Sequence, residues 1–280
     1  MTWPALAAAR RRDAAARVPF LIDGVAVGSV AKADLPALRA WPQWLSEQAD
    51  TVNLIATNRD AALATINAAL REQGRVRAWR DELFAIIDPG TGQPLAHTER
   101  AASRFWGTLT LGAHANGYVA NLQGQPTHLW IARRSATKAT DPGLLDNLIG
   151  GGVPAGQTPR QTLLREAWEE AGLTHAQMAA AKPGRVIRLH RDIAEGLQLE
   201  DLHSFDVRLP EGTTPHNQDG EVAGFECMPT PQALACAASG QMTVDAALVT
   251  LDFALRHHLL QGEQASLLAL ASAHLFLRSG

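Results

Sequence analysis

The residues with the most evident chemical potential form one short charged cluster. Arg165, Glu166, Glu169 and Glu170 fall at helical spacing, and Gly172 follows them. Carboxylates so close together repel one another, and a helix rarely carries three of them unless a cation neutralises the charge. Oxygen ligands at this density suit a hard divalent ion, Mg²⁺ or Mn²⁺. The cluster therefore predicts attack of water on a phosphorus centre whose oxygens are held by the metal.

The flanking residues predict where this helix begins and ends. Thr158 suits the N-cap, Pro159 suits the first helical position, and Gln161 completes a capping box with Thr158. Gly172 suits the left-handed position that ends a helix. Apolar residues recur at helical spacing between these limits and predict a buried stripe formed by Leu163, Leu164, Ala167, Trp168 and Ala171.

The carboxylates are expected on the face opposite that stripe. Glu166 and Glu170 are one helical turn apart, and Glu169 lies beside them. Arg165 precedes Glu169 by four residues and can pair with it. A solvent-facing acidic helix is the plainer alternative for such a pattern, and the metal site is the alternative that explains its density.

The whole stretch resembles the Nudix box, Gly-x5-Glu-x7-Arg-Glu-U-x-Glu-Glu-x-Gly-U, in which U is apolar. The matching positions are Gly151, Arg165, Glu166, Ala167, Glu169, Glu170, Gly172 and Leu173. Gln157 departs from the pattern because it stands where the box has its first Glu, which in the family is more often a partner of the box Arg than a metal ligand. Gln157 can accept a hydrogen bond but brings no charge. The departure weakens the anchor of Arg165 and leaves the ligands in place.

The resemblance implies a fold and a reaction. The fold is an α/β/α sandwich with a mixed sheet, in which the box forms a loop, a helix and a second loop. The reaction is Mg²⁺-dependent hydrolysis of a small-molecule diphosphate, with Mn²⁺ as the other suitable ion. Glu166, Glu169 and Glu170 correspond to metal ligands, or to two ligands and a base, and Arg165 corresponds to the residue that orients them.

The sequence around the box narrows the substrate. Residues 129–138 and 219–226 are similar to a Nudix subgroup whose N-terminal domain is also fused to thiamine pyrophosphokinase in some fungi. The junction segment, residues 100–118, fits the same subgroup. The subgroup is associated with hydrolysis of thiamine diphosphate and its oxidised analogues, which predicts a thiamine monophosphate analogue and phosphate as products.

Further residues are candidates for the catalytic and substrate-binding site. Glu221 follows Asp219 and Gly220 where a predicted strand begins, and it is a candidate general base or additional ligand. Guanidinium and ammonium groups match phosphate oxygens, and glycines let backbone amides approach a phosphate closely. The residues expected to hold the diphosphate on these grounds are Arg133, Arg134, Lys138, Gly150, Gly151 and Gly152.

The non-phosphate half of the substrate has weaker candidates. His114 and Asn116 are expected either to contact it or to make structural hydrogen bonds. Trp79, Trp106 and Trp130 are candidates for stacking on a flat heterocycle, although tryptophans more commonly pack in a core.

The composition excludes several classes of protein. The 280 residues carry a net charge of −3, which gives no basic footprint for nucleic acid. No apolar run is long enough to span a membrane. Cys227 and Cys236 are too few for a disulfide scaffold, so we expect reduced thiols in a cytoplasmic protein. The arginines at positions 10–12 follow the apolar residues, and we expect a plain N-terminal helix rather than a transit peptide.

The chain divides into two predicted domains. Residues 1–112 carry no catalytic motif and are expected to form a small α/β accessory domain, and residues 113–280 are expected to form the Nudix domain. The first domain has helical patterns near 5–16, 33–48 and 59–72 and strand patterns near 20–30, 52–56 and 83–87. The second has strand patterns near 117–122, 128–132, 186–190, 203–209 and 221–228 and two closing helices near 244–260 and 264–277. These helices are expected to pack through Leu248, Leu251, Leu255, Leu267, Leu270 and Leu275.

Several functions stay open at this level. ADP-ribose or another nucleoside diphosphate would be cleaved by the same metal chemistry. A ligand-sensing module without turnover would keep the fold and lose the reaction. Isomerisation of isopentenyl diphosphate needs a Cys and a Glu on opposite faces of an alkene, and neither cysteine lies in a motif expected for it. The residues leave the oligomeric state open, with a homodimer as one alternative.

Overall fold

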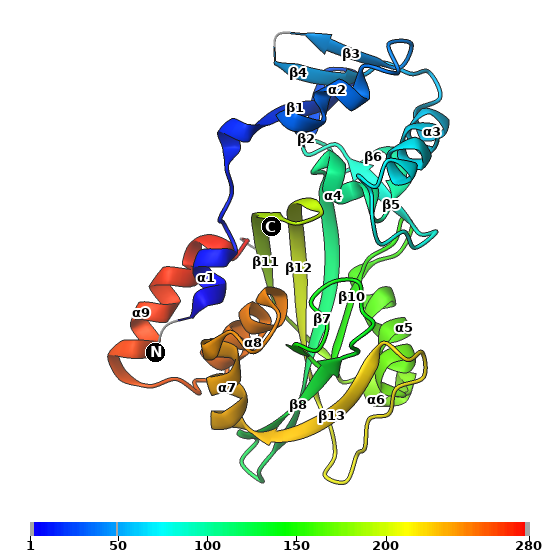
Figure 1. Ribbon diagram of the computed structural model, residues 1–280. Helices are drawn as coiled ribbons and strands as arrows, with labels where there is room; N and C mark the ends of the chain where they lie inside the picture. The colour runs from blue at the N-terminus through cyan, green and yellow to red at the C-terminus, as the bar shows by residue number, and fades with distance from the viewer. Residues whose placement is uncertain (1–2, 49, 278–280) are drawn as a thin grey trace.

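The computed structural model describes residues 3–48 and 50–277 (Figure 1). A large mixed sheet of seven strands lies between helices, and a smaller sheet of four strands lies at one end of the molecule. The predicted α/β class with a mixed sheet is therefore confirmed. None of the helices described is both long and apolar enough to cross a membrane.

The N-terminal part combines a small sheet with a helix and a hairpin. Its sheet has the order β2-β1-β4-β3, in which β1 and β4 are parallel. Its strands are β1 (Arg17–Ile22), β2 (Val25–Ala31), β3 (Leu45–Gln48), β4 (Thr51–Leu54), β5 (Leu83–Ile87) and β6 (Pro94–Glu99). Its helices are α1 (Pro4–Ala8), α2 (Leu35–Leu38), α3 (Arg59–Glu72) and α4 (Ala102–Trp106). The buried faces of β1, β4 and α3 meet the Trp106 ring in one core.

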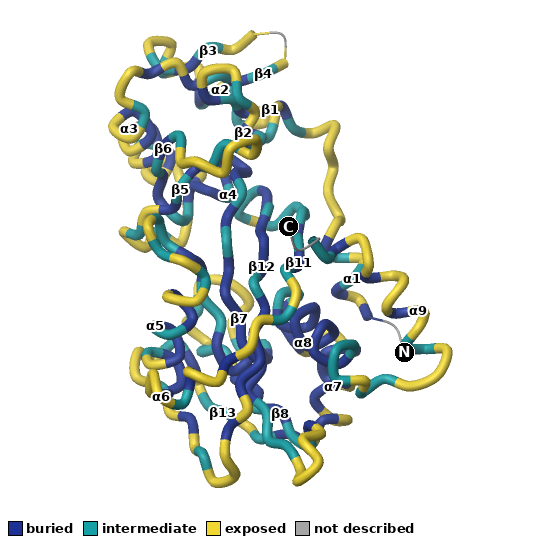
Figure 2. The backbone as a smooth tube through the Cα atoms, turned by 180° about the vertical axis from the view of Figure 1, so that it is seen from behind, coloured by how far each residue is buried: buried dark blue, intermediate teal, exposed yellow. Residues whose placement is uncertain are grey.

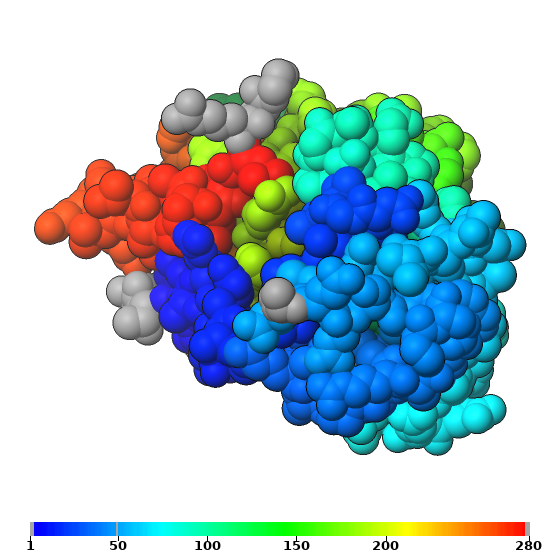
Figure 3. All heavy atoms as spheres, turned by 90° about the horizontal axis from the view of Figure 1, so that it is seen from above, coloured from blue at the N-terminus to red at the C-terminus, as the bar shows by residue number. Residues whose placement is uncertain are grey.

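Three N-terminal predictions are wrong in detail. The expected strand over 20–30 is a hairpin, because Asp23 and Gly24 both adopt positive φ and form a two-residue turn. The expected helix over 33–48 is a short helix, α2, followed by strand β3. The expected helix over 5–16 ends at Ala8. Helix α1 then packs against α8 and α7 rather than the small sheet, beside the red C-terminal segment (Figure 3).

The larger part contains the mixed sheet, in the order β11-β12-β7-β8-β13, with β10 beside β7 and β9 beside β8. Its strands are β7 (Leu109–Ala120), β8 (Pro126–Arg134), β9 (Leu145–Asp146), β10 (Ile149–Gly152), β11 (Lys182–Ile193), β12 (Gly196–Arg208) and β13 (Val222–Pro229). Its helices are α5 (Pro159–Ala171), α6 (His175–Met178), α7 (Thr230–Ser239), α8 (Val244–Arg256) and α9 (Gly262–Ser272). Short 3-10 turns occur at Ala14–Ala16, Lys32–Asp34 and Ala273–Leu275.

Strand β7 is the centre of the large sheet. It pairs with β12 in parallel along most of its length, with β10 through its first half and with β8 through its second half. Ala113 and Ala115 face the α5 side, and the alternate residues His114 and Asn116 are buried on the α8 side. A strand that is buried on both faces does not alternate between apolar and polar residues. The first half of β7 was therefore not predicted from the sequence. Figure 2 shows β7 and β12 as buried strands through the middle of the molecule.

Helices cover the two faces of this sheet unequally. Helix α5 packs on β10 and β7 on one face, and α7 and α8 pack on the other. Helix α7 was not predicted, because its Ala-rich sequence lacks a strong periodic pattern. The closing helices pack as expected through Leu248 and Leu251, but Leu267 and Leu270 on α9 are exposed, which contradicts their predicted packing role.

The buried amide of Asn67 provides a test of the N-terminal core. Its oxygen accepts a hydrogen bond from the indole of Trp106 at 2.8 Å, and its nitrogen donates to Thr98 at 2.8 Å. Asn67→Ala leaves both partners unsatisfied, so we expect a loss of about 2–4 kcal/mol in the free energy of unfolding. Denaturant titration measures it. Thr65→Ala on the exposed side of the same helix is the control and should change stability by no more than about 0.5 kcal/mol.

Candidate active site

Helix α5 forms as its flanking residues predict. Thr158 accepts a hydrogen bond from the Gln161 amide and the Gln161 side chain accepts one from the Thr158 amide, which completes the capping box. Gly172 ends the helix with φ of 63°. The apolar stripe is narrower than expected, because Leu163, Ala167 and Ala171 are buried while Trp168 is 52% exposed. Leu164 is half-buried.

Glu166 and Glu170 lie on the side of α5 that faces the sheet and not on its solvent-facing side. Their exposed fractions are only 8% and 6%. They share a sector of the helix surface with the apolar stripe, since residues 163, 166, 167, 170 and 171 all turn toward β10 and β7. The prediction that these carboxylates oppose the stripe is therefore wrong, and both groups are removed from most of the solvent.

Strand β10 gives these carboxylates room because its last three residues are glycines. A Cβ atom on Gly151 would lie 2.3 Å from Oε1 of Glu166. The Gly150 amide donates to Oε2 of Glu170 at 2.9 Å. A Cβ on Gly150 would meet the His114 ring, and one on Gly152 would lie 2.7 Å from the Phe84 ring. The three glycines thus serve close side-chain approach within a paired strand, and the Gly150 amide is already occupied by a carboxylate.

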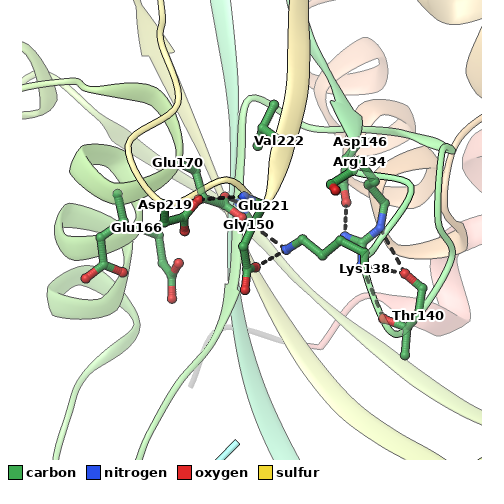
Figure 4. Close-up of polar contacts among 12 residues, drawn as sticks. Arg134, Lys138, Thr140, Asp146, Gly150, Glu166, Glu170, Asp219, Glu221 and Val222 are labelled. Atoms are coloured by element: carbon green, nitrogen blue, oxygen red, sulfur yellow. Dashed lines mark hydrogen bonds and ion pairs between the residues drawn. The ribbon is translucent and has the colours of Figure 1, made fainter. Parts of the chain in front are cut away.

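Lys138 connects the helix to a second segment (Figure 4). Its Nζ lies 3.6 Å from Oε1 of Glu170 and donates a hydrogen bond to Glu221, and its side chain is only 9% exposed. Burial raises the pKa of Glu170 to about 8; Lys138 opposes that shift and Glu166 adds to it. The negative charge at Glu170 is therefore incompletely compensated by the protein.

Glu221 stands immediately before β13, as predicted. It accepts hydrogen bonds from Lys138 and, at 2.9 Å, from Nη1 of Arg80. Burial disfavours its charged form, but the two cations outweigh that effect and lower the pKa of the Glu221 carboxyl. The two cations thus favour the ionised form of Glu221.

Arg165 holds two carboxylates of α5, one buried and one half-buried. Its guanidinium donates to Glu166 at 2.7 Å and to Glu169 at 2.8 Å, so the predicted pairing with Glu169 is present. Burial raises the pKa of the Glu166 carboxyl in spite of this neighbouring cation. Gln157 accepts from the Thr162 hydroxyl at 2.9 Å, and the further acidic group near Arg165 is Glu82 of the N-terminal part, at 4.0 Å.

Of the three predicted phosphate-binding cations, Lys138 alone contacts these carboxylates. Arg134 donates to Asp146 at 2.7 Å and to the Thr140 carbonyl at 2.8 Å, so it fastens the loop that follows β8. Arg133 is exposed and donates to the Gly143 carbonyl at 3.0 Å. The structure thus occupies both arginines with loop contacts.

His114 and Asn116 belong to a buried hydrogen-bonded chain. His114 Nδ1 lies 3.1 Å from the Asn147 side-chain oxygen, and Asn147 donates to Asn116 at 3.1 Å. Asn116 donates in turn to the Val249 carbonyl of α8 at 3.3 Å. Each side chain therefore makes the structural hydrogen bonds that were one of its two predicted roles.

The tryptophans have separate environments. Trp106 is fully buried in the N-terminal core, which rules it out as a stacking platform. Trp79 lies under the Arg71 guanidinium, 4.8 Å from its ring centroid, and donates to Asp81. Trp130 on β8 is half-buried and packs against the core on the α5 side of the sheet. Ala132, two residues later on the same strand, faces the same side. The Trp130 indole nitrogen is buried and has no hydrogen-bond partner among the described residues.

A divalent ion suits this donor set. Within the residues that the structure describes, no three Asp, Glu, His or Cys side chains gather into a complete metal cage. Mg²⁺ does not need one, since it keeps several waters and binds through one or two carboxylates together with substrate phosphates. Glu166, Glu169 and Glu170 are the donors available from α5. The raised pKa of buried Glu170 marks the position where added positive charge is most favourable.

Two charged residues near this site, Arg80 and Glu82, were missed by sequence reasoning, and Arg100 was placed in the junction segment but not at the site. All three lie beside the β5–β6 hairpin of the N-terminal part. Arg100 donates to Glu82 at 2.9 Å, and Glu82 lies near Arg165. In the sequence they are indistinguishable from solvent-facing charges, because only the packing of the two parts brings them to the box.

Comparisons with known proteins identify the family of the chain. A family model described as NUDIX domain matches residues 111–248, and a model of a domain of unknown function, DUF4743, matches residues 4–110. Nudix hydrolase 20, chloroplastic, of Arabidopsis thaliana is 33% identical over 270 residues, which cover 90% of this chain and 71% of that protein. Nudix hydrolase 24, chloroplastic, of the same plant is 32% identical over 262 residues, with the same coverage of 90% and 71%. The crystal structure of DR0079 from Deinococcus radiodurans has 22% identity and a TM-score of 0.45, covering 68% of this chain and 99% of that chain.

The close approach of β10 to α5 predicts the effect of one methyl group. Gly151→Ala must displace the Glu166 carboxylate, which is the flexible end of a side chain, so the fold should tolerate the change. We expect turnover of the diphosphate substrate to fall at least about 10-fold, with a loss of stability below about 2 kcal/mol. Gly224→Ala on β13 is the matched control, because its added methyl meets nothing within 4 Å. Equal activity of the two variants would contradict the assigned position of Glu166.

The pKa of Glu170 predicts a pH dependence of stability. The folded protein holds this proton up to about pH 8, whereas an ordinary Glu releases it near 4.5, so metal-free protein should lose stability as the pH rises from about 4.5 to 8. Thermal melts in a chelator should show this fall for the wild type and a flatter profile for Glu170→Gln. Added Mg²⁺ should raise the wild-type melting temperature more at pH 8 than at pH 6. Parallel profiles for the two proteins would contradict the assignment.

Proposed function

We propose that this chain, which belongs to the Nudix hydrolase family and is a pyrophosphohydrolase, uses Mg²⁺ to hydrolyse a specific diphosphate. The proposed substrate is thiamine diphosphate or one of its oxidised analogues. The observation that carries the metal-dependent reaction is the convergence of Glu170 of α5 with Glu221 around Lys138, with Glu166 one turn earlier on the same helix. It supplies carboxylates for an ion, a cation for phosphate and a base for water in one place. Mn²⁺ is the alternative ion.

The chain's own residues support the following reaction. Glu166, Glu169 and Glu170 hold the divalent ion, which when bound supplies positive charge that offsets the charge developing on the phosphate oxygens. Arg165 orients Glu166 and Glu169 through its two hydrogen bonds.

A carboxylate removes the proton from the attacking water. Glu166, whose pKa is raised by burial, and Glu221, which is held ionised by Lys138 and Arg80, are the two candidates. The water oxygen bonds to the terminal phosphorus, and the bond from that phosphorus to the bridging oxygen breaks. The products are a thiamine monophosphate analogue and inorganic phosphate. Lys138 is positioned to donate to the phosphate oxygens beside Glu221.

The thiamine moiety rests on sequence and on one aromatic side chain. The segments 129–138 and 219–226, which resemble the thiamine-associated subgroup, include most of β8 and the start of β13, and they contain Lys138 and Glu221. Trp130 lies on β8 within the first of these segments, with an indole N–H that has no partner among the described residues. A flat heterocycle can pack against the half-buried ring of this tryptophan.

A substrate panel tests both parts of the proposal. The wild-type protein with Mg²⁺ is incubated with thiamine diphosphate, its oxidised analogues, ADP-ribose and NADH, and phosphate and monophosphate products are measured. We expect phosphate release from the thiamine set. Glu170→Gln should reduce that rate by about 100-fold or more, because a metal ligand and its charge are lost. Glu226→Gln on the exposed side of β13 is the matched carboxylate-to-amide control and should retain the wild-type rate.

The outcomes separate the reaction from the substrate. A preference for ADP-ribose or NADH would keep the metal chemistry and reject thiamine. Unchanged turnover in Glu170→Gln would reject the box as the catalytic centre.

A further inference from the structure

The N-terminal part is joined to the active-site region by specific contacts. The Ala155 amide, which follows β10, donates to the Leu83 carbonyl of β5 at 2.8 Å. Gly152 of β10 approaches the Phe84 ring so closely that a Cβ there would lie 2.7 Å from it. The segment that precedes β5 is therefore held at a defined position beside the Nudix box, and its side chains can be part of the site.

The backbone around Arg80 is firmly specified. Ala78 and Asp81 both adopt left-handed conformations, with φ of 59° and 58°, and they bracket Trp79 and Arg80. The Arg80 amide donates to the buried carboxylate of Glu99 at 2.9 Å. Non-glycine residues in left-handed conformations persist where surrounding contacts enforce them, and they cluster at functional sites. This loop thus aims Arg80 in one direction.

That direction leads to the catalytic carboxylates. Nη1 of Arg80 donates to Oε1 of Glu221 at 2.9 Å, opposite the hydrogen bond that Lys138 makes to the other oxygen. The Arg80 side chain is 39% exposed, and in the described part of the chain its guanidinium has no other hydrogen-bond acceptor. It therefore keeps several free N–H donors at the open side of the site.

The other nearby arginines are directed elsewhere. Arg134 is committed to Asp146 and Thr140. Arg100 also keeps free donors, but its hydrogen bond is to Glu82 of the N-terminal part and it lies over the Phe84 ring. Arg165 is bound to two carboxylates of α5. Arg80 therefore has a guanidinium group that is directed at Glu221 and that keeps further N–H donors for a ligand.

We propose that Arg80, supplied by the N-terminal part, binds a phosphate oxygen of the substrate and makes that part a component of the active site. The inference rests on the proposed diphosphate hydrolysis and adds the residue that recognises its anionic group. With an ion at the α5 carboxylates, Lys138 would no longer be needed beside Glu170, and Arg80 already has free N–H donors beside Glu221 for a diphosphate. A planar guanidinium matches phosphate oxygens in two-pronged geometry.

Variants of Arg80 test the proposal. Arg80→Gln should raise KM for the diphosphate substrate by about 10- to 100-fold, the loss expected for a charge-assisted hydrogen bond, with kcat changed less than about 3-fold. The Kd of methylenediphosphonate in the presence of Mg²⁺, measured by calorimetry, should weaken by a similar factor. Arg80→Lys keeps the charge and loses the fork, so it should recover part of the affinity. Arg77→Gln, an exposed arginine bonded to the Gly74 carbonyl, is the matched control and should behave as wild type.

Binding of the non-hydrolysable probe separates the two levels of inference. Wild-type protein that neither binds methylenediphosphonate with Mg²⁺ nor turns over any diphosphate would reject the proposed function itself. Wild-type protein that binds the probe, together with an Arg80→Gln variant of equal affinity and equal KM, would overturn the role of Arg80 alone. Equal affinity and equal KM would overturn the substrate-binding role of Arg80 even if the variant melted at a lower temperature. Arg80 would then serve only to join the N-terminal part to the active-site region.

Discussion

Two carboxylates, Glu166 and Glu170, are buried between a helix and a strand, and the rest of the site is arranged around that constraint. Burial disfavours their charged forms, as the raised pKa of Glu170 shows. The arrangement is sterically possible because β10 has no side chains at Gly150 and Gly151, and it is electrostatically tolerable because an amide, Lys138 and Arg165 surround the oxygens. The proposed divalent ion would neutralise the charge that this burial leaves incompletely compensated.

The other charged groups of the site come from segments that are distant in the chain. Lys138 arrives on the loop after β8, Glu221 on the loop before β13, and Arg80 from the N-terminal part. The long strand β7 makes this convergence possible, because β10 pairs with its first half and β8 with its second half. The large sheet therefore positions the box, and the N-terminal part extends the site at its open side.

Local signals in the sequence predicted the local structure well. The bounds of α5 follow from Thr158 and Gly172, whose capping roles depend only on neighbouring residues. The extent of β7 could not be predicted, because small residues buried on both faces give no alternation. The box residues could be identified from their spacing, but the inward direction of Glu166 depends on the glycines of β10. Arg80 was beyond prediction, since its contact with Glu221 spans 141 positions in the chain.

The central claim is that the carboxylates of α5 form a divalent-cation site, and anomalous diffraction from crystals grown with Mn²⁺ tests it most directly. The account predicts a strong peak within coordination distance of Glu166, Glu169 or Glu170, with Lys138 moved away from Glu170 and no peak in Glu170→Gln crystals. Crystals with Lys138 still beside Glu170 and with no manganese at α5 would contradict the claim.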